Sequence, residues 1–224
     1  MDTMTPQAKQ RHTDVARQLE MRRESQRQNR RREILASTLK GVRRHGPMVS
    51  TAQIAALAKC SKETLYAWFG DRDGLMQALV EEQADAMAAL LERQEPRLGE
   101  SVTSQLKRQA VLLLDMMTGD AYLGVHQIAM AQDRSKGGRN LGQSVMEVWR
   151  KSVASRFATL MDAGVAQGVV VVYSAQDAFE DFTALLIGDR QRRLLLGEDA
   201  RPAADRMEAV AEKAVQRWLV LYGV

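Results

Sequence analysis

The sequence predicts an all-α fold, and three observations lead to this prediction. The 224 residues include only four prolines and 5% aromatic residues. Good helix formers (Ala, Leu, Met, Glu, Gln and Arg) are abundant, whereas runs of Val, Ile and Thr, which favour strands, are few. Apolar residues recur at helical spacing between breaks that contain glycine or polar residues.

Composition excludes several classes of protein. Hydrophobic residues make up 45% and charged residues 27% of the chain, so it can bury a core and should fold. One cysteine and three scattered histidines cannot supply a disulfide framework, a zinc cluster or a thiol redox pair, so we expect no metal and no cofactor. No apolar stretch approaches the roughly 20 residues of a membrane span, and the polar N-terminus lacks a signal-peptide core. We therefore expect a cytoplasmic protein with no membrane partner.

Positive charge is concentrated near the N-terminus. Residues 1–80 carry 15 Lys and Arg against 8 Asp and Glu, which indicates that this end meets a polyanion. Residues 1–28 form a basic arm that has almost no apolar residues and is expected to be helical at most in part. Two interpretations of the arm remain open: a solvated, partly disordered tail, or a helix that lies along phosphates. The second rests on one helical stripe of arginines, namely Arg23, Arg27, Arg30 and Arg31.

A three-helix domain with a helix-turn-helix is predicted within residues 29–75. Its first helix has an apolar face and ends at Gly46, a C-cap glycine that a proline follows. Ser50-x-x-Gln53 is a capping box that starts the short helix TAQIAALA, and Ser61 caps a second short helix, KETLYAWF. Two short helices joined by a tight turn are typical of a helix-turn-helix, which binds DNA.

Residues 76–224 are predicted to form a second helical domain, entered by a helix that Asp71 caps. Further helices are expected at about 102–118, 120–133, 141–166, 175–196 and 203–222. The stretch 168–174 is apolar and β-like, but a single strand has no partner. We therefore expect an extended connection there.

The order and spacing of residues 31–79 carry a resemblance to a known family. The residues concerned are Ile34-Leu35, Gly46, Thr51, Ile54-Ala55, Ala58-Lys59-Cys60-Ser61, Thr64-Leu65-Tyr66, Trp68-Phe69, Arg72 and Leu75. In this order they resemble the tetracycline-repressor (TetR) family of bacterial transcriptional regulators. The segments DFTALLIGDRQRRLLLG and RWLVLYG of the second domain look like the AefR-like branch of that family.

The resemblance implies two sets of DNA contacts. The set that faces the major groove consists of Lys62, Glu63, Tyr66 and Ala67. Of these, Lys62 can bond a guanine, Glu63 can accept from a cytosine, and Ala67 can touch a thymine methyl. The set that grips the DNA backbone consists of Ser50, Thr51, Thr64, Tyr66, Trp68 and Arg72. Structural alternatives stay open, because the helix dipole alone favours Glu63, while Ser50 and Thr64 suit ordinary caps and Trp68 can cover the domain edge.

Lys59 departs from the family pattern, which has a glycine at this turn. The position often needs a positive φ, where a side chain costs ~1–2 kcal/mol. We expect a slightly altered turn, which would change the tilt of the second short helix.

The second domain shows no pattern of a catalytic site. It lacks a P-loop, a nucleophile elbow and a His and carboxylate pair at metal spacing, so we expect no enzyme. Its methionines are adaptable side chains that recur at binding surfaces. The candidate ligand-binding residues are Met116, Met117, Tyr122, His126, Met130 and Trp149. The alternative is that each of them is ordinary bundle core.

The last two long helices carry more apolar residues than a small bundle needs, and in the family the corresponding helices pair across a two-fold axis. The predicted dimer interface consists of Phe182, Leu186, Trp218 and Leu221. The prediction is a ligand-responsive repressor that binds a palindromic operator in double-stranded DNA as a homodimer and is released by a small, mainly apolar effector. An architectural or ligand-independent DNA-binding regulator is the alternative.

Overall fold

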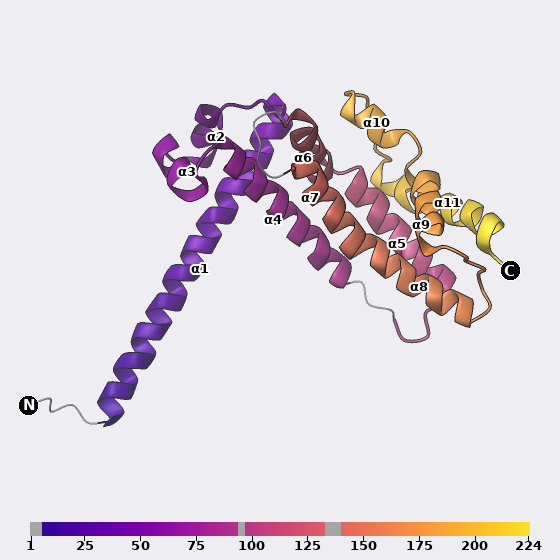
Figure 1. The fold of residues 1–224 in the computed structure, drawn as a ribbon, viewed down its shortest axis with the longest axis horizontal. Helices are drawn as coiled ribbons and strands as arrows, with labels where there is room; N and C mark the ends of the chain where they lie inside the picture. Colours follow the sequence, from indigo (N-terminus) through magenta and orange to yellow (C-terminus); the bar gives the residue numbers. More distant parts are fainter. Residues whose placement is uncertain (1–5, 94–96, 133–139) are drawn as a thin grey trace, which may run out of the picture.

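The computed structural model describes residues 6–93, 97–132 and 140–224, and the described chain is helical, as predicted (Figure 1). The N-terminal helices are α1 (Pro6–His45), α2 (Thr51–Ala58), α3 (Lys62–Phe69) and α4 (Arg72–Glu92). Those that follow are α5 (Val102–Met117), α6 (Asp120–Ala131), α7 (Leu141–Val148), a π-helix (Trp149–Ala154), α8 (Ser155–Ala166), α9 (Ala175–Ile187), α10 (Arg190–Leu195), a 3₁₀ turn (Ala204–Arg206) and α11 (Met207–Tyr222). Residues 1–5 of the arm and residues 133–139, between α6 and α7, lie outside the described residues. Within the described ranges, no helix combines the length and the apolar character needed to cross a membrane.

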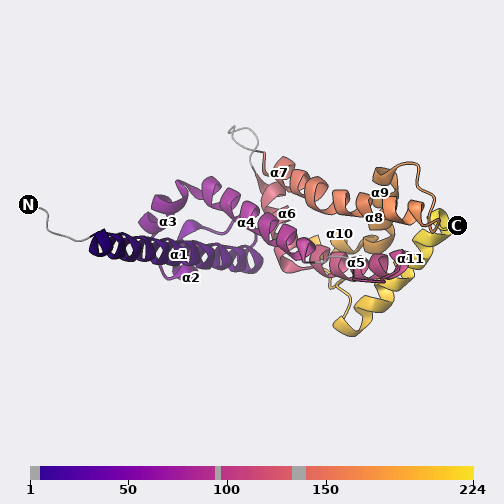
Figure 2. The same cartoon turned by 90° about the horizontal axis from the view of Figure 1, so that it is seen from below.

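Helix α1 is much longer than predicted. The expectation that residues 1–28 are helical at most in part is wrong for residues 6–28, which continue without a break into the helix that ends at His45. Gln, Arg and Glu dominate this segment and lose little side-chain freedom in a helix. The side chain of Gln28 also donates to Glu24, four residues earlier, at 2.8 Å. Figures 1 and 2 show that the N-terminal half of α1 projects away from the other helices.

The head, which we define as residues 30–80, forms a small hydrophobic core. Its fully buried side chains include Ile34, Leu35, Ile54, Leu65 and Leu79. The helices begin where the caps were predicted. Ser50 and Gln53 form the reciprocal capping box of α2, and the Ser61 side chain accepts from the Thr64 amide at the start of α3.

The boundary predicted at residue 75 falls inside α4, because α4 belongs to both parts of the molecule. At its N-terminal end, Leu75 and Leu79 lie in the head core. Farther along, Met87 packs against the core of the second part. Val125 of α6 and Leu141 of α7 also join the head core, so the head is sealed by helices that come much later in the chain.

The second part, which we call the body (residues 97–224), is organised around aromatic side chains. Phe157 of α8 lies with its ring centroid 5.1 Å from that of Phe182 and 5.9 Å from that of Trp218. Trp218 is 0% exposed, and its indole nitrogen donates to the Ala178 carbonyl at 2.8 Å. Buried aromatic pairs of this kind contribute about 0.5–1.5 kcal/mol beyond the area that they bury.

This packing contradicts the predicted interface role of three of the four residues. Phe182, Leu186 and Trp218 are fully buried in the core of their own chain, so they cannot also face a partner. Leu221 is 63% exposed and remains available. The sequence showed apolar stripes on α9 and α11, but a stripe does not reveal which of its residues the same chain covers.

Three predicted helices are interrupted. A π-helix divides 141–166, Gly188 with φ 56° ends α9 inside 175–196, and a 3₁₀ turn precedes α11. The extended stretch 168–174 does find a partner, contrary to expectation. Val170 forms an isolated antiparallel bridge with Gly223, and the Val171 amide donates to Tyr222 O at 2.8 Å.

The burial of Trp218 leads to a first prediction. Trp218→Ala should lower the free energy of unfolding by about 3–5 kcal/mol, because it leaves a cavity among Phe157, Phe182 and α9. Trp218→Phe is the matched variant and should cost clearly less, since it keeps a ring there. Urea unfolding followed by circular dichroism measures both. A Trp218→Ala protein that becomes monomeric while keeping its stability would show instead that Trp218 is an interface residue.

Candidate nucleic-acid interface and cavity

Helix α3 presents one side to the head core and the other to solvent. Leu65 anchors the inner side and is 1% exposed. The four residues predicted to face the major groove all lie on the exposed side: Lys62, Glu63, Tyr66 and Ala67. A helix of eight residues held by one buried leucine therefore carries a compact outward surface of the size that base readout needs.

The N-terminal turn of α3 holds the Glu63 carboxylate. Hydrogen bonds from its own backbone amide and from Ser61 lower the pKa of Glu63 below its usual value, and the charge of Lys62 adds to this. Such contacts are those that the helix-dipole interpretation predicts. The carboxylate can still accept from a base, but it would have to leave these hydrogen bonds.

Three of the predicted backbone-gripping residues, Thr51, Tyr66 and Arg72, tie the elements of the head together. The hydroxyl of Thr51 lies 3.3 Å from that of Tyr66, which links the start of α2 to α3. Arg72 donates to the Pro47 carbonyl in the loop before α2, so in the free protein its guanidinium positions that loop. Thr51 and Arg72 are both half-buried, so each keeps a solvent-exposed part while it holds the head together.

A third group of contacts connects α1 to the C-terminal end of α3 and to the turn between α2 and α3. The guanidinium of Arg27 lies over the Trp68 ring at 5.4 Å, and that of Arg31 over the Phe69 ring at 5.7 Å. Between them, Arg30 donates to Ala58 O at 2.9 Å. We call Arg27, Arg30 and Arg31 the arginine clamp. Their spacing on one helical stripe was visible in the sequence, but their partners were not.

Lys59 adopts the left-handed conformation that its position was expected to need. Its φ and ψ are both 51°, and it is the non-glycine residue with positive φ among the described residues. Its carbonyl accepts a hydrogen bond from Arg30 at 3.3 Å. The turn therefore keeps a glycine-like backbone with a lysine in it.

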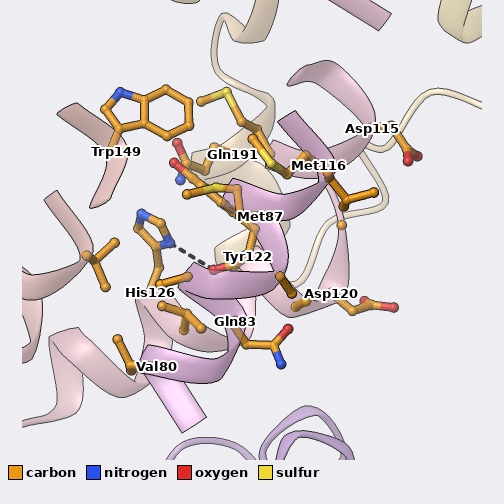
Figure 3. Close-up of a pocket in the computed structure, with 18 of the residues that line it drawn as sticks. Val80, Gln83, Met87, Asp115, Met116, Asp120, Tyr122, His126, Trp149 and Gln191 are labelled. Carbon is orange, nitrogen blue, oxygen red and sulfur yellow. Dashed lines mark hydrogen bonds between the residues drawn. The ribbon is translucent and has the colours of Figure 1, made fainter. Parts of the chain in front are cut away.

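The body contains a cavity of about 670 Å³ between α4, α5, α6 and the π-helix. Five of the six predicted ligand-binding residues line it: Met116, Met117, Tyr122, His126 and Trp149. Figure 3 shows Met87 of α4, His126 of α6 and Trp149 of the π-helix placed around it. Met130 does not line the cavity and is 64% exposed, because α6 turns that side outward. The lining residues of α4, which the sequence analysis did not identify, include Val80, Gln83, Met87 and Leu90.

The two titratable residues inside the cavity are both neutral near pH 7. Burial raises the pKa of Tyr122 to about 12, and burial lowers the pKa of His126 below its usual value. The His126 Nδ1 lies 2.8 Å from the Tyr122 carbonyl, which can only accept, so Nδ1 carries the proton. The Nε2 of the neutral ring is then an acceptor. The cavity thus offers an apolar wall with a few neutral hydrogen-bonding groups, which is typical of small-molecule sites.

Three charged residues also line this cavity, namely Asp115, Asp120 and Arg201, and each is in an ion pair, Asp120 with Arg43 of α1. Arg201 donates to Asp115 at 2.6 Å, and both side chains are partly exposed. A pair of this kind adds no net charge for an ionic ligand to recognise. The cavity interior therefore favours an uncharged ligand, since burying a charge without a partner costs several kcal/mol.

Comparisons with known proteins point to one family. Residues 104–224 match the model of the AefR-like transcriptional repressor, C-terminal domain. The structure is similar to that of a TetR transcriptional regulator from Agrobacterium tumefaciens, at 32% identity and TM-score 0.70, with 88% of this chain and 95% of that one covered. A putative TetR-family regulator from Mesorhizobium loti has 20% identity and TM-score 0.73, with 88% and 98% covered. The Flavonoid-responsive Regulator FrrA has 20% identity and TM-score 0.61, with 87% and 97% covered. A comparison with curated protein sequences found no match.

The left-handed Lys59 leads to a second prediction. Lys59→Gly should raise the free energy of unfolding by about 0.5–1 kcal/mol, because removal of the side-chain strain exceeds the extra chain entropy of glycine. Lys59→Ala is the matched control: it removes the amine, keeps Cβ and should bring no gain. Urea unfolding of the three proteins measures the differences. Equal stabilities of the Gly and Ala variants would mean that the turn is not strained.

Proposed function

The chain belongs to the TetR family of transcriptional regulators, and on that premise we propose that it is a ligand-responsive repressor, which binds a palindromic operator as a homodimer and leaves it when a small, mainly apolar effector binds. Membership of the family makes it a DNA-binding transcriptional regulator and not an enzyme. The proposal places its action in the cytoplasm. The following observations support it.

The outward surface of α3 supports sequence readout. Lys62 is exposed at the N-terminal end of α3, where a helix in the major groove meets base edges, and it can donate to guanine O6 and N7. Thr51 and Arg72, each with a solvent-exposed part, suit phosphate contacts, which fix the register of the helix on the duplex.

Two exposed apolar residues at the C-terminal end of α11 support a homodimer. Val220 is 83% exposed and Leu221 is 63% exposed, and neither is covered by the described chain. A closed two-fold dimer would bury both patches at once and present two identical heads. Two such heads read an inverted repeat whose half-sites lie about one helical turn apart, roughly 34 Å, or a multiple of it.

The position of helix α4, between the head core and the cavity, is the observation that best supports a ligand response. Leu75 and Leu79 hold its first turns in the head core, while Met87 and Leu90 line the cavity. A ligand that fits the cavity of one arrangement better than that of another shifts α4, and with it the head. The spacing between the two heads of a dimer changes while each head stays intact.

An architectural regulator and a ligand-independent regulator are the competing functions. An architectural protein binds all sequences alike and with a strong salt dependence. A ligand-independent regulator leaves the cavity without an effect on DNA binding. The two experiments below separate these functions from the proposal.

The third prediction tests base readout. On an operator selected from a random duplex library, Lys62→Ala should weaken binding by ~1–3 kcal/mol and relax the preference at one position of each half-site. Lys40→Ala removes the same charge from an exposed position of α1 outside α3, and it should leave this preference unchanged. Fluorescence anisotropy titrations on operator and scrambled duplexes measure both. An equal loss on both duplexes for Lys62→Ala would contradict base readout.

The fourth prediction tests release by a ligand in the cavity. A compound that raises the melting temperature should be sought among small uncharged aromatic compounds, and calorimetry should then show weaker binding of it when operator is present. This follows because the coupling between two binding sites is reciprocal. Equal affinities with and without operator would exclude the mechanism.

Two matched variants localise the effect. Met116→Trp fills part of the cavity and should abolish release while operator binding persists. Met130→Trp makes the same change on the exposed side of α6 and should release normally. Loss of release in both variants would place the ligand elsewhere.

A further inference from the structure

The N-terminal half of α1 reaches beyond the head at the end of the molecule that also carries α3. Figures 1 and 2 both place α3 and this segment at the end opposite the C-terminus. The arginine clamp begins at Arg27, so residues 6–26 extend past it, and we call them the α1 extension. At 1.5 Å per residue these 21 residues span roughly 30 Å, close to one helical turn of DNA.

The arginine clamp fixes the direction of the α1 extension. Arg27, Arg30 and Arg31 hold successive positions on one face of α1 and reach both the α2–α3 turn and the C-terminal end of α3. Arg31 also lies 3.6 Å from Glu82 of α4. Because α1 is one uninterrupted helix, a duplex that docks on α3 meets the extension at a defined angle.

The described part of the α1 extension carries unpaired positive charge. Arg22 and Arg23 are exposed, and no ion pair within the described residues involves either of them. Arg23 lies one turn before Arg27 on the same face. The charge therefore continues the stripe of the arginine clamp beyond the point where it touches the head.

The described side chains of the α1 extension bury little apolar surface that would stabilise it. Leu19 and Met21 are both exposed, and the rest of its side chains from residue 18 to residue 26 are polar and exposed. With only these two apolar side chains among residues 18–26, the helix has little apolar surface to pack against a copy of itself. A polyanion beside it would stabilise the helix by neutralising its arginines.

We propose that the α1 extension is a second DNA-contacting element, which lies on the sugar-phosphate backbone flanking each half-site, with Arg22 and Arg23 as phosphate contacts. This inference rests on the proposed function, because the operator sets where the flank lies. It assigns the extension no base readout. Each head thereby covers more duplex than α3 alone, and the added affinity depends on salt and not on sequence.

The test compares Arg22→Gln/Arg23→Gln with Arg192→Gln/Arg206→Gln, which removes the same charge from exposed positions of the body. Affinity for the selected operator and for a scrambled duplex is measured over a series of salt concentrations. The first variant should lower the slope of log affinity against log salt by about 0.9 per lost contact, so by about 1.8, on both duplexes. The second variant should keep the slope of the unaltered protein.

Hydroxyl-radical footprinting gives an independent readout. The unaltered protein should protect sugars outside the half-sites, and Arg22→Gln/Arg23→Gln should lose this outer protection alone. Operator binding with an unchanged slope and footprint would overturn the role of the extension and leave the proposed function standing. If light scattering without DNA gives Arg22→Gln/Arg23→Gln a different oligomeric mass from that of the unaltered protein, the proposal is overturned in favour of pairing between two α1 extensions. If the unaltered protein prefers no sequence, the proposed function fails instead.

Discussion

Helix α4 has to satisfy two hydrophobic cores at once, and the rest of the structure depends on this constraint. Leu75 and Leu79 are buried at one end, and Met87 packs against the body at the other. Each fully buried leucine contributes ~1.5–3 kcal/mol, so neither end can be released cheaply. A helix transmits displacement along its axis with little bending. The residues of α4 that line the cavity and those that pack in the head core are therefore parts of one rigid helix.

The cavity is suited to this arrangement because it is large, is lined by elements that are far apart in the chain, and has its charged lining residues in ion pairs. Burial keeps Tyr122 and His126 neutral, so these two residues can recognise polar groups of a ligand only through hydrogen bonds. Asp115 and Arg201 neutralise each other at the rim. The π-helix at Trp149 adds an aromatic wall, and π-helical turns often occur at functional sites. In the proposed release from DNA, occupation of the cavity acts on α4 through packing and not through charge.

Charge is concentrated instead on the head and on α1. The arginine clamp holds α1 against the C-terminal end of α3 and against the turn between α2 and α3, where one arginine donates to the carbonyl of Lys59. That hydrogen bond helps to support a lysine in a conformation that normally favours glycine. The same clamp sets the direction in which the remaining arginines of α1 point. The contacts that stabilise the head thus also fix the direction of the α1 extension.

The sequence by itself determined the elements that depend on neighbours along the chain. The caps at Ser50 and Ser61 involve residues within a few positions of each other, so they could be predicted, and with them the helix-turn-helix. The positive φ at Lys59 and the exposed side of α3 were implied by the resemblance to the TetR family. Tertiary structure alone decided which apolar side chains lie inside. Trp218 and Leu221 are three residues apart on one helix, yet the first is core and the second is surface, because α5, α9 and Phe157 of α8 cover only one side of α11. Met116 lines the cavity and Met130 does not for the same reason: burial is set by packing between helices that are distant in the sequence.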